Sequence, residues 1–342
     1  MVEPFRFSRV TSTSLKPFLN IDALIHRLEC SDNLILTFSL SEKLEARHIL
    51  KTRNYYTLSI YKKQLPYSNE NTTFSFSELM RLIYFDEFLR HQISQFTYRI
   101  EEMLKTTVIT SACVNYKGPY CKGECYLDEK LYLNSKVYDD VLASFERIVQ
   151  ENKSSLAIKH HLDKKQGRFP LWVLTEVMSF GQVTFFFSAL ESHIKKNWAY
   201  YGFLSQDTSL KTIKGEELCG RLFSWFSAAW FLRNLCSHNQ RIYGRLFNSG
   251  RPQLCSCDIR KLKQYGKKKD DNSDLFAYLI SIKNLLLFDS MATQQRWNDF
   301  LDSLEICLYQ DTKLVRLSKM GFVDDWKNLL RINMEKGLKQ LL

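Results

Sequence analysis

The sequence has few glycines and prolines, 12 and 6 among 342 residues. So small a supply of turn-forming residues argues against a β-sandwich, which needs many tight turns, and against a low-complexity chain. The apolar content is 45% and the aromatic content 14%, which excludes intrinsic disorder. A chain of this length can bury a core in one large domain or in two ordinary ones. We therefore predict a folded, mainly helical protein.

Several enzyme motifs are also absent. The sequence has no Walker loop, no G-x-G-x-x-G, no H-E-x-x-H and no G-x-S-x-G, which leaves an NTPase, dehydrogenase, zinc protease or serine hydrolase without support. Cys121-x3-Cys125 and Cys255-x-Cys257 could together supply four thiolates, but neither has the C-x2-C spacing typical of zinc knuckles. We expect no metal and no other cofactor.

The cysteines and the apolar segments indicate the compartment. Nine cysteines is an odd number, and no N-terminal stretch combines a basic start, an apolar run and a small-residue cleavage site. These features predict free thiols in a reducing cytoplasm. The apolar stretch 171–190 carries Glu176 and Gln182, which are costly inside a bilayer. We predict that it forms a pair of buried helices rather than a membrane span.

The net charge is +11, from 48 Lys and Arg against 37 Asp and Glu. A positive excess of this size favours polyanionic partners such as nucleic acid or an anionic membrane surface. It is equally consistent with a soluble protein that happens to be basic.

Apolar residues that recur every three or four positions predict helices along most of the chain. The expected helices span residues 21–28 behind Asn20, 41–50 behind Ser39 or Ser41, 77–111, 137–151, 171–190, 216–245, 274–289 and 294–308. Gly181 predicts a kink or a close helix crossing, and the helix at 216–245 must be central because it is apolar on most faces. The aromatic cluster at 54–61 is extended or packs the N-terminal part onto the next domain.

We divide the chain into three regions. Residues 1–70 form an N-terminal helical or extended region, 71–250 a helical core, and 251–342 a basic C-terminal helical region packed on that core.

An unusual cluster of polar residues, Arg233-Asn234-Leu235-Cys236-Ser237-His238, stands at the polar end of the helix at 216–245. On an ideal helix Asn234 and His238 share a face, whereas Arg233 and His238 diverge by roughly 140°. The R-x4-H pattern alone is weak, because a histidine near a helix C-terminus is commonly only a partner of the helix dipole. A structural and a catalytic interpretation both stay open at this point.

Five segments, in order, carry a resemblance to one family. They are Lys16-Pro17 with Asn54-Tyr55-Tyr56-x-Leu58-Ser59-x-Tyr61; Tyr84-x-Asp86-x-x-Leu89-Arg90 with Arg99-Ile100-Glu101; Pro170-Leu171-Trp172-Val173-x-x-Glu176-Val177-x-Ser179-Phe180-Gly181; Leu232-Arg233-Asn234-x-Cys236-Ser237-His238; and Met320-Gly321-Phe322-x-x-x-Trp326. Together they resemble the Abi family of bacterial abortive-infection proteins, the AbiD/AbiF-like group of the HEPN superfamily. Ser237, Asn239 and Val323 depart from the family pattern, which has Ala, a second His and Pro there.

The resemblance implies an all-α, HEPN-like helical bundle with a small N-terminal helical extension and additional C-terminal helices. It also implies a metal-independent endoribonuclease that acts as a growth-arresting toxin in anti-phage defence, restrained by an RNA or protein antitoxin. The active site would be composite and formed by a homodimer. Arg233 would bind the phosphate, His238 would act as base or acid, and Asn234 would orient His238 or the substrate. Two rivals are a non-catalytic RNA-binding module and a magnesium-dependent nucleotidyl transferase.

Basic residues outside the motif are candidates for RNA contact. The strongest either follow the motif or cluster densely: Arg241, Arg245, Lys267, Lys268 and Lys269. Arg90 and Arg99 match family positions, but they could instead form a buried Arg–Glu network with Glu101 that holds helices together. Lys159 and His160 line an RNA groove or lie in a solvated loop. Trp172, Phe180 and Trp230 are expected in the core.

Overall fold

The computed structural model describes residues 18–30, 34–66, 72–206, 215–268 and 270–341. These residues are almost entirely helical, with two three-residue strands, so the all-α prediction is confirmed. The chain divides into two compact units, an N-terminal unit of residues 1–84 and a main unit of residues 85–342. The predicted division into three regions, with boundaries at residues 70/71 and 250/251, stays a prediction.

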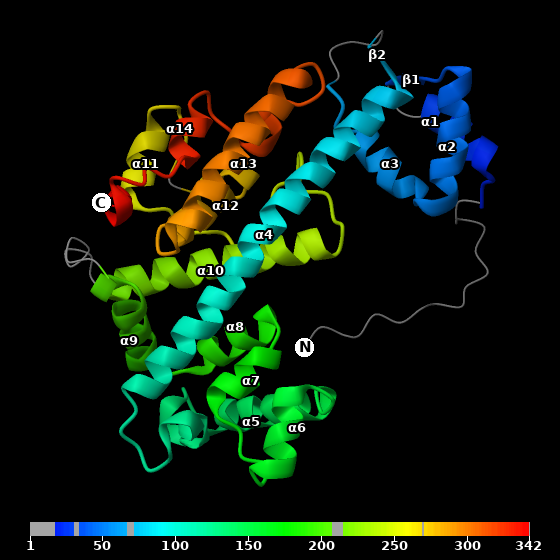
Figure 1. Ribbon diagram of the computed structural model, residues 1–342. Helices are drawn as coiled ribbons and strands as arrows, with labels where there is room; N and C mark the ends of the chain where they lie inside the picture. Colours follow the sequence, from blue (N-terminus) through cyan, green and yellow to red (C-terminus); the bar gives the residue numbers. More distant parts are fainter. Residues whose placement is uncertain (1–17, 31–33, 67–71, 207–214, 269, 342) are drawn as a thin grey trace. The chain divides into compact units, whose positions relative to one another are not determined.

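The N-terminal unit consists of short helices beside one pair of strands (Figure 1). Its elements are α1 (Ile21–Cys30), β1 (Ile35–Thr37), α2 (Leu40–Thr52), α3 (Tyr55–Lys62), β2 (Thr73–Ser75) and the start of α4 (Phe76–Val114). The strands pair in parallel, with Leu36 opposite Phe74. Asn20 accepts from the Ala23 amide at 2.8 Å, and Ser39 caps α2, as predicted.

Residues 55–61 are helical rather than extended, so the extended alternative is wrong. Asn54 caps α3 by accepting from the Tyr56 amide at 2.9 Å. Leu58 and Tyr61, three positions apart, are buried together on one face of the helix. A cap and a helical spacing therefore outweigh the β-propensity of the tyrosines.

The main unit holds the remaining helices (Figure 1). The α-helices are α5 (Ser135–Glu151), α6 (Leu156–Lys164), α7 (Leu171–Val177), α8 (Phe180–Ala189), α9 (Ser192–Gly202), α10 (Gly215–Ser237), α11 (Ser256–Lys263), α12 (Leu275–Leu286), α13 (Met291–Gln310) and α14 (Trp326–Leu330). Short 3-10 helices are η1 (Lys122–Leu127), η2 (Glu129–Leu131), η3 (Leu204–Gln206), η5 (Leu317–Met320) and η6 (Gly337–Leu341). Helix α6 was not predicted, because Lys and His make that segment polar.

Helix α10 lies in the centre of this unit, as its apolar sequence predicted. Leu222, Trp225 and Ala229 are fully buried, and α10 packs against α9 and α12. Every residue of α12 is buried as well. The prediction that the helix continues to residue 245 is wrong, because α10 ends at Ser237.

The segment 171–190 forms two helices, α7 and α8, as predicted. Ser179 and Gln182 form a capping box that begins α8. A Cβ added to Gly181 would lie 3.4 Å from Trp230 Nε1 on α10, so α8 and α10 do cross closely at this glycine, although an alanine would also fit. No helix in the described part of the chain is both long enough and apolar enough to traverse a bilayer.

The expectation of three core aromatics holds only for Phe180, which is fully buried. Trp172 is 53% exposed and Trp230 is 37% exposed, so the prediction for these two is wrong. Each indole lies against a glycine: Trp172 is within 2.8 Å of the Cβ position of Gly123, and Trp230 covers Gly181. One face of each ring is covered while much of the rest remains in water, as is common for tryptophan.

Candidate active site at the end of α10

The chain leaves α10 through a left-handed residue. Asn239 has a φ of +50°. Its amide donates to the Cys236 carbonyl at 3.1 Å, while the Gln240 amide donates to the Leu235 carbonyl at 2.9 Å. This is the Schellman arrangement, which favours Gly or Asn at the left-handed position. Asn239, which stands where the family pattern has a second histidine, therefore ends the helix.

His238 occupies the last turn before this helix end. Its amide donates to the Asn234 carbonyl at 3.0 Å, so these two residues lie one turn apart, as predicted. The side chain is exposed, and within the described residues the imidazole makes no hydrogen bond or ion pair. Both ring nitrogens are therefore accessible to a substrate or to a second subunit.

Arg233 is half-buried between α10 and α4. Its Nη1 donates to Asn234 Oδ1 at 3.2 Å, and its Nε lies 3.7 Å from Glu101 Oε2. That Nε is shielded from water yet has no hydrogen-bond partner in the structure. Glu101 also pairs with Lys105 at 3.1 Å, so its charge is shared. The guanidinium thus has donors that its protein neighbours do not fully use, although no contact joins it to the His238 imidazole among the described residues.

A buried carboxylate fixes the loop that follows α10. Asp86 on α4 is fully buried and accepts from the amides of Ile242 and Tyr243 at 3.1 and 2.6 Å. It also forms an ion pair with Arg90, which is only 7% exposed. The segment around Asp86, which carries part of the family resemblance, therefore anchors the loop that follows the motif at 233–238. Nothing in its spacing indicated that Asp86 would bind backbone groups some 156 residues away.

The cysteine inside the motif is not poised as a nucleophile. Cys236 is buried, and loss of hydration raises the pKa of its thiol to about 11. A thiol with this pKa stays protonated at neutral pH, whereas nucleophilic cysteines are thiolates. Cys236 is therefore not a candidate nucleophile at this end of α10.

The structure favours the buried-network alternative for Arg90 and an ion-pair role for Arg99. Arg90 pairs with Asp86 and lies 4.0 Å from Glu87, so its partners are these acids rather than Glu101. Arg99 donates to both carboxylate oxygens of Asp289 at 2.7 and 3.1 Å, and these bonds raise its pKa. An RNA phosphate would have to compete with these carboxylates.

Arg241 and Arg245 brace the loop after α10. Arg241 Nη1 donates to the Tyr243 carbonyl, and Arg245 Nη1 donates to Gln240 Oε1 at 3.0 Å. Both are half-buried beside the motif. They remain the predicted phosphate contacts that lie nearest in sequence to Arg233 and His238.

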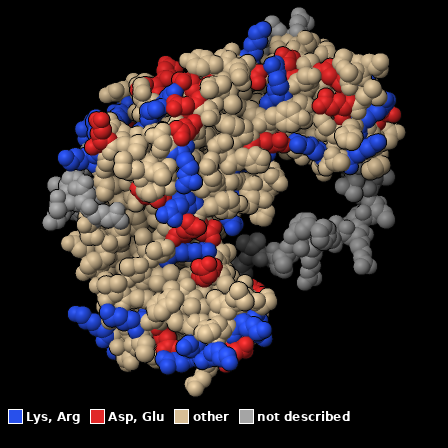
Figure 2. Space-filling model, in the orientation of Figure 1, with Lys and Arg blue, Asp and Glu red and all other residues tan. Residues whose placement is uncertain are grey.

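The other predicted RNA contacts lie on separate elements. Lys159 and His160 are exposed on α6, and Lys268 is exposed after α11, whereas Lys267 is paired with Asp274. Lys269 lies outside the described residues. Figure 1 places α6 and α11 on opposite sides of α10. Figure 2 shows basic and acidic side chains interspersed over the visible face.

The two cysteine pairs do not form a four-thiolate site in the described structure. Across those residues, one group of three metal-binding side chains lies within 4.8 Å, namely Cys255, Cys257 and Asp258. It includes neither Cys121 nor Cys125. Asp258 already accepts from Lys283 Nζ at 3.3 Å and from Asn284 Nδ2 at 2.8 Å, which offsets its charge.

Comparison with known proteins supports the resemblance. A family model described as "Abi-like protein" matches residues 48–244, more than half of the 342 residues. No curated protein and no solved structure matches the chain. The matched span contains Asp86, Arg233 and His238, and the family suggests a role in abortive-infection defence. The chain belongs to the family of Abi-like proteins.

Proposed function

We propose that this protein is a metal-independent endoribonuclease that arrests growth in abortive-infection defence. The observation that carries the proposal is the exposed imidazole of His238, one helical turn from Asn234, at the same helix end as Arg233. Among the described residues, the Arg233 Nε has no hydrogen-bond acceptor. This pairing of a proton-transfer group with a phosphate-binding group suits the cleavage of RNA.

The chemistry needs no metal, because RNA carries its own nucleophile. A base removes the proton of the 2′-hydroxyl, and O2′ then forms a bond to phosphorus. The bond from phosphorus to O5′ breaks, and an acid supplies the proton that O5′ takes up. The products are a 2′,3′-cyclic phosphate and a free 5′-hydroxyl. Arg233 would stabilise the charge on the non-bridging oxygens, and an imidazole can serve as base or acid near neutral pH.

A complete site requires a second imidazole. The reaction uses a base and an acid, but no other described histidine contacts His238. A homodimer that brings two copies of the α10 end together would supply both groups. We therefore place the active site at a two-fold interface, where Asn234 orients either the imidazole or the substrate.

Such an enzyme would act in the cytoplasm, where its RNA substrates are. It would also need restraint in the uninfected cell. A chain with a net charge of +11 suits an RNA antitoxin, because counterion release from phosphates drives such binding.

The test is cleavage of total cellular RNA by the purified protein in EDTA, after co-purified nucleic acid has been removed. His238→Ala should abolish cleavage. His193→Ala is the matched control, because His193 is also an exposed histidine, on α9. The parent and this control should leave 2′,3′-cyclic phosphate ends. Equal cleavage by the His238→Ala protein would exclude the proposed role.

One observation favours a non-catalytic RNA-binding module instead. The pair between Arg233 and Glu101 joins α10 to α4, so Arg233 could serve only to hold the two helices together. The double variant Arg233→Ala/His238→Ala distinguishes the two functions. A folded, dimeric, RNA-binding double variant that no longer arrests growth supports catalysis, whereas persistent growth arrest supports the binding module.

A further inference from the structure

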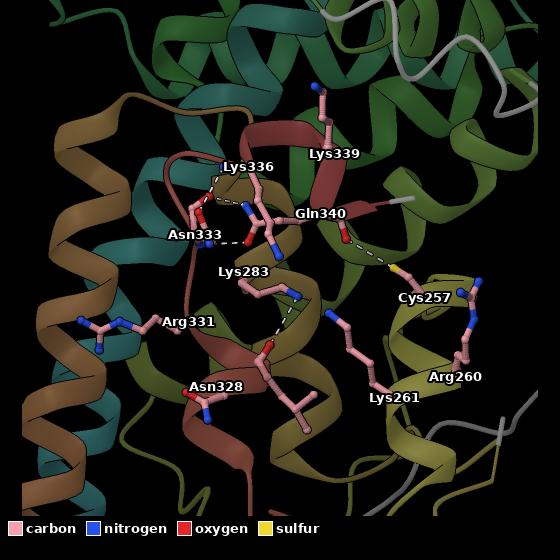
Figure 3. A pocket seen from close by; sticks show the side chains of 11 residues that line it. Cys257, Arg260, Lys261, Lys283, Asn328, Arg331, Asn333, Lys336, Lys339 and Gln340 are labelled. Carbon is pink, nitrogen blue, oxygen red and sulfur yellow. Dashed lines mark hydrogen bonds between the residues drawn. The ribbon is translucent and has the colours of Figure 1, made fainter.

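A basic pocket lies at the C-terminal end of the main unit, outside the segment that matches the family model. It is a cavity of about 400 Å³ between α11, the α12 residue Lys283 and the chain from residue 328 to residue 340 (Figure 3). This volume is within the range of small-molecule sites.

The pocket concentrates positive charge. Of the described residues that line it, six are Lys or Arg and none is Asp or Glu. Figure 3 shows the ammonium groups of Lys261, Lys283 and Lys336 pointing toward one another from three different segments. Like charges at close range repel, and more strongly where the protein displaces water. A bound anion would attract all three ammonium groups and so offset their mutual repulsion.

Most of these cations are not neutralised within the protein. Lys283 is buried, and its Nζ lies 3.3 Å from Asp258 Oδ1. Arg331 pairs with Asp302 at 2.9 Å. The remaining four, Arg260, Lys261, Lys336 and Lys339, form no ion pair with any described residue.

The wall that carries Lys336 is held in place by hydrogen bonds. Gln340 Nε2 donates to the Asn333 carbonyl at 2.8 Å, and the Asn333 amide donates to Gln340 Oε1 at 2.9 Å. Cys257 Sγ on α11 lies 3.5 Å from the Gln340 carbonyl, which ties this loop to the opposite wall. The backbone that carries Lys336 is therefore preorganised, so less backbone entropy is lost when a ligand binds.

The lining selects phosphate rather than a nucleobase. Leu329 is the one apolar aliphatic residue, and no aromatic ring lines the pocket among the described residues. Single-stranded nucleic acid sites hold bases by stacking on aromatic rings, which this pocket lacks. We propose that it is a binding site for adjacent phosphate groups, carried by the 5′ end of an RNA strand or by a free polyphosphate such as a nucleotide.

This inference does not depend on the ribonuclease, and its test measures binding alone. The variant Lys261→Gln/Lys336→Gln removes two of the three converging charges, and both side chains are exposed. The control Lys136→Gln/Lys153→Gln removes two exposed lysines from residues outside the pocket. Calorimetry would measure binding of pyrophosphate and of short RNAs with a 5′-triphosphate or a 5′-hydroxyl.

We expect the pocket variant to lose pyrophosphate affinity about tenfold or more, because charge-assisted hydrogen bonds are lost, while the control keeps parental affinity. Thermal unfolding without ligand should show the pocket variant to be as stable as the parent or more stable, since repulsion is relieved. If the 5′-triphosphate RNA binds more tightly than both pyrophosphate and the 5′-hydroxyl RNA, and the pocket variant loses this preference, the ligand is an RNA end. If the 5′-triphosphate adds no more affinity than pyrophosphate alone, the ligand is a free polyphosphate. No pyrophosphate binding by the parent, or equal losses in both variants, would overturn the proposal.

Discussion

Replacing Asp86 by alanine should destabilise the main unit far more than removing a surface acid. Asp86 is fully buried, and its carboxylate accepts from the amides of Ile242 and Tyr243 while it pairs with Arg90. Alanine would remove the carboxylate that pairs with Arg90 and would deprive two amides of their acceptor.

Breaking a buried ion pair by removing one partner costs about 3–5 kcal/mol. Each buried amide that loses its acceptor adds roughly 1–3 kcal/mol where water cannot reach it. A loss of at least ~3 kcal/mol is therefore expected, or roughly 6 °C or more in Tm for a unit of this size. The same change should loosen the loop after α10 and weaken any activity of His238.

The matched control is Glu102→Ala on the same helix. Glu102 also pairs with an arginine, Arg99, at 2.8 Å, but its side chain is 67% exposed. Exposed pairs contribute about 0–1 kcal/mol, so this variant should unfold almost as the parent does. The double variant Asp86→Ala/Arg90→Met should recover part of the loss, because no buried charge is left unpaired. Thermal unfolding followed by circular dichroism measures all three, and an Asp86→Ala midpoint within 1 °C of that of Glu102→Ala would refute the reasoning.

Three further predictions concern the contribution of single residues to stability. Asn239→Ala should lower stability by about 1 kcal/mol and Asn239→Gly should not, as measured by urea unfolding, because the residue has a φ of +50°. Hydrogen bonds from two serines lower the pKa of Glu42 to about 2, so its stabilising effect is present above pH 4.5 and lost as the pH falls toward 2. The difference in unfolding free energy between the parent and Glu42→Gln should therefore shrink as the pH falls from 6 to 3. A difference that stays constant over this range would contradict the prediction for Glu42. Gly321→Ala should unfold at a much lower temperature than Gly266→Ala, because both glycines have a positive φ but only at Gly321 would a Cβ collide with Asp274.

The sequence predicted the helices well where one periodic pattern dominated. The spacing of apolar residues placed a helix at 77–111, and α4 spans Phe76–Val114. The end of α10 was predicted too late because the residues up to 245 remain compatible with a helix. Only the left-handed Asn239 and the acceptor supplied by Asp86 make the chain turn there. An asparagine is a stop signal that the sequence does offer, whereas the contact with Asp86 is tertiary and cannot be inferred from a one-dimensional pattern.

The candidate site was only partly predictable, because several of its contacts join residues that are distant in sequence. Arg233, Asn234 and His238 are adjacent in sequence, so a motif could identify them. Whether a basic residue faces an RNA or a carboxylate depends on its partner in the fold. Arg99 meets Asp289, 190 residues away, and no spacing rule anticipates that bond. The convergence of Lys261, which belongs to a basic run in the sequence, with Lys336 was not predicted, because their segments are distant in sequence and meet only in the folded chain.

The contacts of Asp86 explain why two segments of the family resemblance are needed together. The segment around Asp86 and the segment around His238 are separated by more than a hundred residues, yet two amide hydrogen bonds join α4 to the loop that follows α10. Helix α10 is held by the core up to its last turn, where Leu235 and Cys236 are still buried, but the residues from Ser237 to Gln240 are exposed. The buried carboxylate supplies support from outside the helix, because a bond to two consecutive amides fixes the direction in which the chain leaves. The backbone at His238 is therefore held between α10 and a fixed loop although its imidazole is exposed, which the proposed catalytic role would require.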